Sequence, residues 1–194
     1  MKEFVKRYPG TFVDMIGSIG YTDGSNQAKH VDDGIERACL LIEEQAQRKG
    51  KVIFIGNGGS AAISSHMSID FWKNGNIPSM SFNDGALLTC LGNDYGYDKV
   101  FEKPIEMFMN NEDVLIAISS SGKSPNILNG VRTAKDIGCA AITLSGFRED
   151  NPLRKMGSHN FYVPADKYGF VEIVHQYICH WILDSILYNR SIYK

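Results

Sequence analysis

The stretch from Lys51 to Asp70 reads KVIFIGNGGSAAISSHMSID, and its three parts together decide the fold. Val52 to Ile55 form a short apolar run rich in β-branched side chains, which is typical of a strand buried on both faces. The three glycines between positions 56 and 59 allow the backbone to turn sharply, and Ser60 stands where a helix N-cap is favoured. The stretch therefore predicts a strand, a glycine-rich turn and a helix, in that order.

The junction between this turn and its helix predicts an anion site. The N–H groups of a first helical turn have no partner within the helix, and the helix dipole places positive charge at the same end. The spacing matches neither GxGxxG nor GxxxxGK[ST], which disfavours a dinucleotide fold and a P-loop NTPase. A tight turn with a purely structural role is the alternative. We expect the ligand to be a phosphate or another anionic group.

The same order of strand, loop and helix returns at residues 113–124, DVLIAISSSGKS. Val114 to Ile118 read as a buried strand, and Pro125 suits the first position of the helix that follows. The loop between them offers the hydroxyls of Ser119, Ser120, Ser121 and Ser124. Hydroxyl and backbone donors at the end of a parallel strand can surround a phosphate without a metal. A solvated serine-rich loop is the alternative.

The remaining pattern completes an α/β fold. Further strands are predicted at residues 79–82, 139–145 and 160–164, and the helices that alternate with them imply a parallel sheet covered on both faces, a three-layer sandwich. Further helices are predicted over residues 30–49, 86–91, 100–109 and 169–187, with a turn at 92–96. Residues 1–26 mix apolar residues with glycines, and we expect helical pieces joined by turns. We predict a single domain over residues 1–194, with an N-terminal helical segment (1–50) that packs partly on another subunit.

The composition describes an ordinary globular protein. The chain has 194 residues, 43% of them hydrophobic, and a formal charge of −2, which disfavours nucleic-acid binding. No run approaches the length of a membrane span, and the N-terminus lacks the apolar core of a signal peptide. The four cysteines form no CxxC pair and sit in apolar segments, so we expect buried free thiols. A cytoplasmic protein is expected.

Two helices carry side chains suited to chemistry. His66 and Asp70 are four residues apart and share one helix face, and Glu172, Gln176 and His180 form a stripe on the last helix, with His175 beside it. An imidazole and a carboxylate from each helix could bind one zinc ion, or could act as base and acid without metal. From spacing alone, structural histidines with satisfied hydrogen bonds are the favoured interpretation of His66 and His180.

Four ordered motifs resemble the phosphoheptose isomerases, a family with the SIS (sugar isomerase) fold. They are GNGGSAAISSH at 56–66, GNDYG at 92–96, SSSGKS at 119–124 and EIVHQYICH at 172–180. The resemblance implies a five-stranded parallel sheet in flavodoxin-like order and a homotetramer with sites between subunits. It also implies conversion of a phosphorylated seven-carbon sugar, sedoheptulose 7-phosphate, to D-glycero-D-manno-heptose 7-phosphate, a step in the biosynthesis of lipopolysaccharide or capsule.

The resemblance also implies roles for residues at matching positions. The sugar phosphate would be held by Ser60, Ser119, Ser121 and Ser124. The sugar pocket would be lined by Asn57 and Asp94, and we also expect Gly58, Ser120 and Glu172 to contact the substrate. One Zn²⁺ per subunit would sit on His66, Asp70, Glu172 and His180.

The chain departs from the family pattern at four positions. It has Asp70 where the family has glutamate, Glu172 where it has glutamine, Asn74 where it has arginine, and Gly169 where it has a polar residue. The shorter carboxylate reaches roughly 1.5 Å less far, and a misplacement near that size can lower a rate about a hundredfold. The added charge of Glu172 would strengthen metal binding and lower the metal's Lewis acidity. We interpret the site as retained but retuned.

The resemblance favours aldose–ketose isomerisation through a cis-enediol. Asp70 would move the proton between C1 and C2, and His180 would protonate or deprotonate the oxygens, with zinc polarising the carbonyl. Two alternatives stay open: a non-catalytic SIS protein that binds a sugar phosphate or a protein partner, such as a replication initiator, and an isomerase of another phosphosugar.

Overall fold

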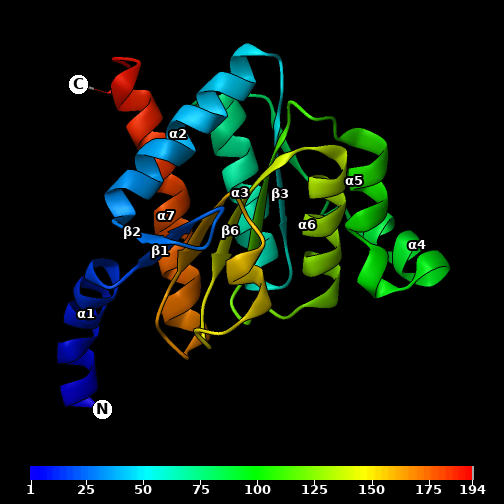
Figure 1. Ribbon diagram of the computed structural model, residues 1–194. Coiled ribbons are helices and arrows are strands. Elements are labelled where there is room, and N and C mark those ends of the chain that lie inside the picture. Colours follow the sequence, from blue (N-terminus) through cyan, green and yellow to red (C-terminus); the bar gives the residue numbers. More distant parts are fainter. Residues whose placement is uncertain (194) are drawn as a thin grey trace.

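The computed structural model describes residues 1–193 and shows one α/β body (Figure 1). In chain order the elements are α1 (Lys2–Gly17), β1 (Gly20–Asp23), β2 (Ala28–Lys29), α2 (Val31–Gln47), β3 (Val52–Gly56), α3 (Gly59–Lys73), β4 (Ser79–Ser81), α4 (Gly85–Tyr95), the 3₁₀ helix η1 (Tyr97–Lys99), α5 (Glu102–Phe108), β5 (Val114–Ser119), α6 (Pro125–Ile137), β6 (Ala140–Ser145), the 3₁₀ helix η2 (Pro152–Lys155), β7 (His159–Tyr162) and α7 (Tyr168–Asn189). The strand–turn–helix units predicted at residues 51–70 and 113–124 are both present.

The sheet confirms the predicted parallel core and extends it. Its strand order is β2-β1-β7-β6-β5-β3-β4, and the five strands from β7 to β4 are mutually parallel. Numbered along the chain, these five lie in the order 2-1-3-4-5, the flavodoxin-like order. The order in which strands are added to the sheet reverses between β3 and β5, so ligands are expected outside the carboxyl ends of these two strands.

Two antiparallel strands at the β7 edge were not predicted. Within residues 1–193 the sheet has seven strands, because β1 pairs antiparallel with β7 and β2 pairs antiparallel with β1. The expectation of helical pieces and turns throughout residues 1–26 was therefore wrong for residues 20–23, which form β1. Tyr21 is 2% exposed, and its hydroxyl is hydrogen-bonded to His159 Nδ1 at 2.8 Å. Its ring lies over Gly34 of α2, where a side chain with a Cβ atom would clash with it. The burial of Tyr21 therefore depends on residues distant in the chain, whereas the glycines close to it in the sequence indicated turns instead of a strand.

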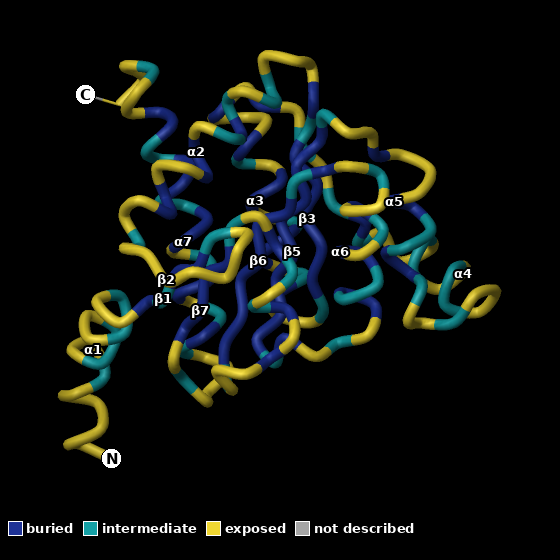
Figure 2. The backbone as a smooth tube through the Cα atoms, in the orientation of Figure 1, coloured by how far each residue is buried: buried dark blue, intermediate teal, exposed yellow. Residues whose placement is uncertain are grey.

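Helices cover both faces of the sheet, which confirms the three-layer architecture. In β3, Val52 and Phe54 belong to the core shared with α2, α3 and α7, whereas Ile53 and Ile55 belong to the core shared with α5 and α6. This division follows from the twofold alternation of side chains along a strand. Figure 2 shows the buried strands enclosed between exposed outer helix faces.

Three local predictions need correction. The predicted turn at 92–96 is mostly the last turn of α4, and only Gly96, with φ +90°, lies outside the helix. The helix continues through Gly92 because Asp84 caps its N-terminus with two hydrogen bonds, and one internal glycine lowers helix stability by only about 1 kcal/mol. Helix α3 is capped by Gly58, so Ser60 lies inside its first turn. Cys90 is exposed, whereas the other three free thiols are buried.

Helix α1 packs on the body along one side only. It has no buried residue and projects from one end of the molecule (Figure 1). Tyr8 and Phe12 pack against Phe170 of α7, with ring centroids 5.1 Å apart in each pair. No helix within residues 1–193 is both long and apolar enough to cross a membrane.

Candidate active site

A pocket of about 230 Å³ opens where β3 and β5 end, at the switch point of the sheet. Two chain segments, the turn from β3 into α3 and the loop from β5 into α6, meet there with the first turns of α7. Its walls include Asn57, Gly58, Gly59, Ser60, Ser119, Ser120, Ser121, Ser124, Tyr168 and Glu172. The structure thus brings together eight residues that the sequence placed at the substrate.

The first wall is the glycine-rich turn. Gly58 has φ +55°, a conformation that side-chain-bearing residues rarely adopt, and α3 begins at the next residue. Ser60 is buried in the first turn of that helix. The free end of α3, with its unpaired N–H groups and positive dipole, therefore faces the pocket and favours an anion.

The second wall is the serine loop. Ser119 Oγ accepts a hydrogen bond from the backbone N–H of Gly122, and Ser121 Oγ accepts one from Lys123, both at 3.2 Å. Both hydroxyls keep their own protons for an external acceptor. The Ser120 hydroxyl is buried and makes no hydrogen bond to any residue that the structure describes. Such an unpaired buried donor is costly in isolation and suits a site whose ligand supplies the acceptor.

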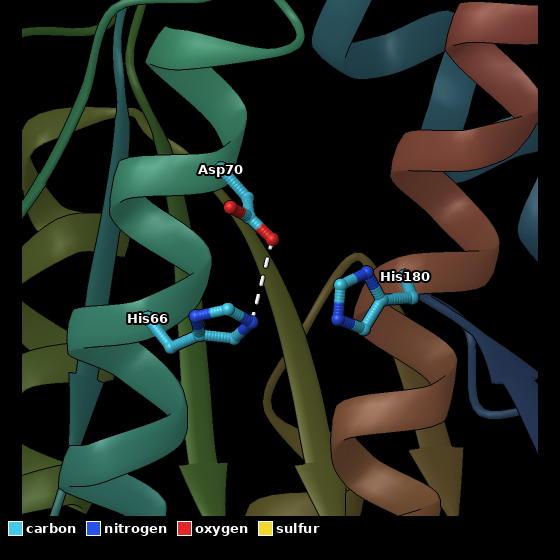
Figure 3. Close-up of side chains that lie close together, drawn as sticks. All are labelled: His66, Asp70 and His180. Atoms are coloured by element: carbon cyan, nitrogen blue, oxygen red, sulfur yellow. Dashed lines mark ion pairs between the residues drawn. The ribbon is translucent and has the colours of Figure 1, made fainter.

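A second group of side chains lies farther along α3 and α7. Ligand atoms of His66, Asp70 and His180 all lie within 4.8 Å of one another. Figure 3 shows the three side chains converging across the space between the two helices. His66 Nε2 is 3.3 Å from Asp70 Oδ2, and the two imidazole centroids are 5.6 Å apart. Two imidazoles and a carboxylate at this separation form a donor set that suits zinc.

One carboxylate oxygen of Asp70, Oδ1, is bonded by Asn74, the residue that follows α3. Asn74 Nδ2 donates to Asp70 Oδ1 at 3.2 Å, leaving Oδ2 toward His66. The departure from arginine noted at Asn74 thus has a structural consequence, because a neutral amide orients the carboxylate without adding positive charge. Asp70 is 18% exposed and His66 is 49% exposed. The group therefore lies at the surface of the chain.

Glu172 stands apart from the three-residue group, although the sequence placed it among the metal ligands. Its carboxylate lies over the start of α3, where a Cβ added to Gly59 would be 2.5 Å away. A groove of about 450 Å³, lined by Glu172, Gln176, Ile173 and His66 among others, runs from this point along α3 and α7. Glu172 therefore lines both the phosphate pocket and the groove that leads toward His66.

The histidines divide differently from what spacing suggested. His175 is the structural one: it is completely buried, its Nε2 lies 3.1 Å from the Ser145 carbonyl oxygen, and burial lowers its pKa to about 4. A carbonyl can only accept, so Nε2 carries the proton of a neutral ring. His66 is exposed and His180 is partly buried, and neither belongs to the hydrophobic core.

Asp94 is the one predicted substrate residue that is absent from these walls. It is exposed on α4, where it accepts hydrogen bonds from Asn93 and the Cys90 thiol. Conversely, the pocket uses residues that the sequence did not single out. Tyr168 lies on its rim, and the buried Asn126 holds Asn57 from behind. Only the position of Asn126 beside Pro125, in the first turn after the serine loop, could have drawn attention to it.

Comparison with known proteins agrees with this geometry. The SIS domain family matches residues 25–146, which include both loops of the pocket. The phosphoheptose isomerase of Solidesulfovibrio magneticus is 36% identical over 152 residues, 75% of this chain and 74% of that protein. The phosphoheptose isomerase of Aliarcobacter butzleri is 32% identical over 162 residues, 80% of this chain and 85% of that protein.

A solved structure extends the likeness to the last helix. The structure of phosphoheptose isomerase GmhA from Neisseria gonorrhoeae matches with a TM-score of 0.83 at 26% identity, covering 95% of this chain and 98% of that one. The match thus includes α7, which carries Glu172 and His180 and lies beyond the matched family segment.

Proposed function

Because the chain belongs to the phosphoheptose isomerase family of SIS domains, we propose that it interconverts the ketose sedoheptulose 7-phosphate and the aldose D-glycero-D-manno-heptose 7-phosphate. The product would serve the synthesis of heptose-containing surface glycans. One observation carries the proposal: a pocket lined by hydroxyls and a helix N-terminus is joined by a groove to a cluster of two imidazoles and a carboxylate. The first part suits a phosphate, and the second suits proton transfer at the other end of the sugar.

The phosphate pocket would bind and orient the substrate. Interactions with a phosphate remote from the reacting carbons provide binding energy that positions C1 and C2. Ser60, Ser119, Ser121 and Ser124 would hold the phosphate oxygens, with Gly58 and Ser120 completing the two loops. Asn57 would contact the sugar, and Glu172 would face it where the pocket meets the groove.

The cluster would carry out the proton transfers. Asp70 would take the proton from C1 of the ketose and return it to C2 of the enediol. His180 would protonate the oxygen on C2 and remove the proton from the oxygen on C1. These two residues come from facing helices, so an enediol bound between α3 and α7 would present its carbons to one and its oxygens to the other.

Zinc fits this donor set. His66, Asp70 and His180 would hold the ion, and Glu172 would join them only after its side chain turns from Gly59 toward the groove. A bound zinc ion would supply Lewis acidity that polarises the carbonyl. Elemental analysis tests this proposal: we expect about one zinc per subunit, and loss of that zinc in His66→Ala.

Turnover by metal-loaded protein tests the function. Sedoheptulose 7-phosphate is supplied, and the aldose is followed by NMR. No product with the wild-type chain would refute the substrate assignment. Asp70→Asn should lower kcat at least a hundredfold, whereas the exposed Asp136→Asn on α6 serves as a matched control and should stay near wild type. Unchanged kcat in Asp70→Asn would refute its role as the base.

A panel of other phosphosugars belongs in the same experiment, because the two loops bind phosphate and leave the sugar unspecified. Turnover of a different ketose phosphate, with none of the heptulose, would identify an isomerase of that sugar. Binding of a sugar phosphate without turnover or zinc would identify a non-catalytic SIS protein.

We also propose that the chain works as a cytoplasmic homotetramer with sites between subunits. His66 is exposed, and so are its apolar neighbours Ile69 and Trp72 on α3 and Ile173 beside the groove. A second subunit covering this face would shield the reacting end of the sugar from water. Phe4, Val5 and Val13 of α1 are also exposed and would contribute to subunit packing. Light scattering should give four times the chain mass, and a monomer would contradict the proposal.

A further inference from the structure

The side chain of Asn57 is paired with that of Asn126 across the two loops of the pocket. Asn57 Nδ2 donates to Asn126 Oδ1 at 2.9 Å, and Asn126 Nδ2 donates back to Asn57 Oδ1 at 2.8 Å. Asn126 is 2% exposed in the first turn of α6, whereas Asn57 lines the pocket. The pair therefore links a buried residue at the start of α6 to a ligand-facing residue of the glycine-rich turn.

A backbone group sets the orientation of both carboxamides. The N–H of Ile127 donates to Asn126 Oδ1 at 3.0 Å. The same N–H also donates to the Ser124 carbonyl oxygen, and a flipped Asn126 would set its NH₂ group against it, so the oxygen of Asn126 is favoured at this position and its nitrogen faces Asn57. The oxygen of Asn57 is then obliged to lie opposite that nitrogen. Flipping either amide would place two oxygens or two N–H groups against each other.

Tyr97 completes the set of contacts around Asn57. Its hydroxyl, on η1, donates to Asn57 Oδ1 at 3.2 Å. The oxygen of Asn57 thus accepts two hydrogen bonds, which is its full capacity, and one of the two Nδ2 protons is used by Asn126. One N–H remains, and it is the only polar group that this side chain still has to offer a ligand.

We propose that Asn126 is a positioning residue that orients Asn57 as a hydrogen-bond donor to an oxygen of the sugar, not of the phosphate, in the bound sugar phosphate. This inference rests on the proposed function, because it assumes a sugar phosphate in the pocket. A residue that only joined the loops would not need this arrangement, since β3 and β5 are already paired up to Gly56 and Ile118. What the amide pair adds is a defined donor in place of a side chain free to present either its oxygen or its nitrogen.

Asn126→Asp tests the inference with a nearly isosteric side chain. The ionised carboxylate still accepts from Ile127 and Asn57, but it cannot donate to Asn57 Oδ1. Once protonated, its O–H restores that bond. At pH 8 we expect kcat/KM about tenfold below wild type, mainly through KM, and the ratio of variant to wild type should rise as pH falls. Asn111→Asp, exposed at the opposite end of the sheet, adds the same charge and should show a ratio near one at every pH.

Binding of inorganic phosphate separates positioning from general damage to the pocket. The serines hold the phosphate, so in Asn126→Asp the affinity for inorganic phosphate should fall clearly less than the affinity for the sugar phosphate. Equal loss of inorganic phosphate and sugar phosphate, or a pH-independent ratio of kcat/KM, would overturn the inference.

A second readout does not depend on turnover. Side-chain amide NMR signals of Asn57 should shift in Asn126→Asp and return toward wild type at low pH. If the wild-type chain converts no heptulose phosphate, the proposed function fails, while these signals still test the pair. Asn57 signals that are unaffected by the substitution would refute the positioning role by themselves.

Discussion

Replacing Gly122 with alanine should damage the serine loop through two separable effects. Gly122 has φ +61°, and holding an alanine in this left-handed region costs about 1–2 kcal/mol. An added Cβ would also collide with the carboxamide of Asn151, which is completely buried. That carboxamide donates to Ser145 Oγ, Gly146 O and Arg148 O, at 3.2, 3.3 and 2.8 Å. Displacing it would break two or more hydrogen bonds, each contributing about 1 kcal/mol.

The expected loss of unfolding free energy is therefore roughly 3–5 kcal/mol. Gly138→Ala is the matched control, because Gly138 has φ +95° at the end of α6 but its added Cβ would meet Asn111 Cβ only at an ordinary 3.6 Å. It should lose only the backbone cost of about 1–2 kcal/mol. Urea unfolding followed by circular dichroism measures both variants.

The loop also predicts a difference in function. Gly122 N–H donates to Ser119 Oγ, so distortion at this position should weaken binding of inorganic phosphate by about tenfold or more in Gly122→Ala and leave Gly138→Ala unchanged. Equal losses of stability in the two variants would refute the reasoning about Asn151. Unchanged phosphate binding in a folded Gly122→Ala protein would refute the role of the loop.

Three further predictions follow from single contacts. In Gly59→Ala the new Cβ would lie 2.5 Å from the Glu172 carboxylate and should displace it, which should lower kcat/KM. The unfolding free energy should stay within about 1 kcal/mol of wild type, because the Glu172 side chain can move away. Burial lowers the pKa of His175 to about 4, so between pH 4 and 6.5 the unfolded chain binds more protons than the folded chain. The unfolding free energy should therefore fall by about 3 kcal/mol as the pH is lowered from 6.5 to 4. In His175→Gln, urea unfolding should show a smaller loss of unfolding free energy over this pH range. Asp113 is completely buried and accepts three hydrogen bonds, so Asp113→Asn should destabilise the chain by about 3 kcal/mol in the same assay, and a loss under 1 kcal/mol would contradict its role.

Much of the fold could be read from the chain because its signals are local. Buried parallel strands are short apolar runs, and glycines or serines after them mark where the chain turns into a helix. The two strand–turn–helix units, the five parallel strands and the pocket at their ends follow from such runs. The same reading went wrong where a local signal opposed a distant contact. Glycines around Tyr21 indicated turns, but its packing on His159 and Gly34 makes the segment a strand.

The chemistry of the site divides in the same way. Helical spacing alone places His66 and Asp70 on one face of α3, and the order of residues places Glu172 and His180 on one face of α7. Which of these four side chains meet is decided by how the two helices pack on the sheet, since a change in their separation or rotation moves each side chain independently of spacing. Tertiary structure therefore brings His180 to His66 and Asp70, leaves Glu172 over Gly59, and sets Asn126 behind Asn57. The sequence determined the kinds of groups present, and packing between segments 69 or more residues apart in the chain determined their partners.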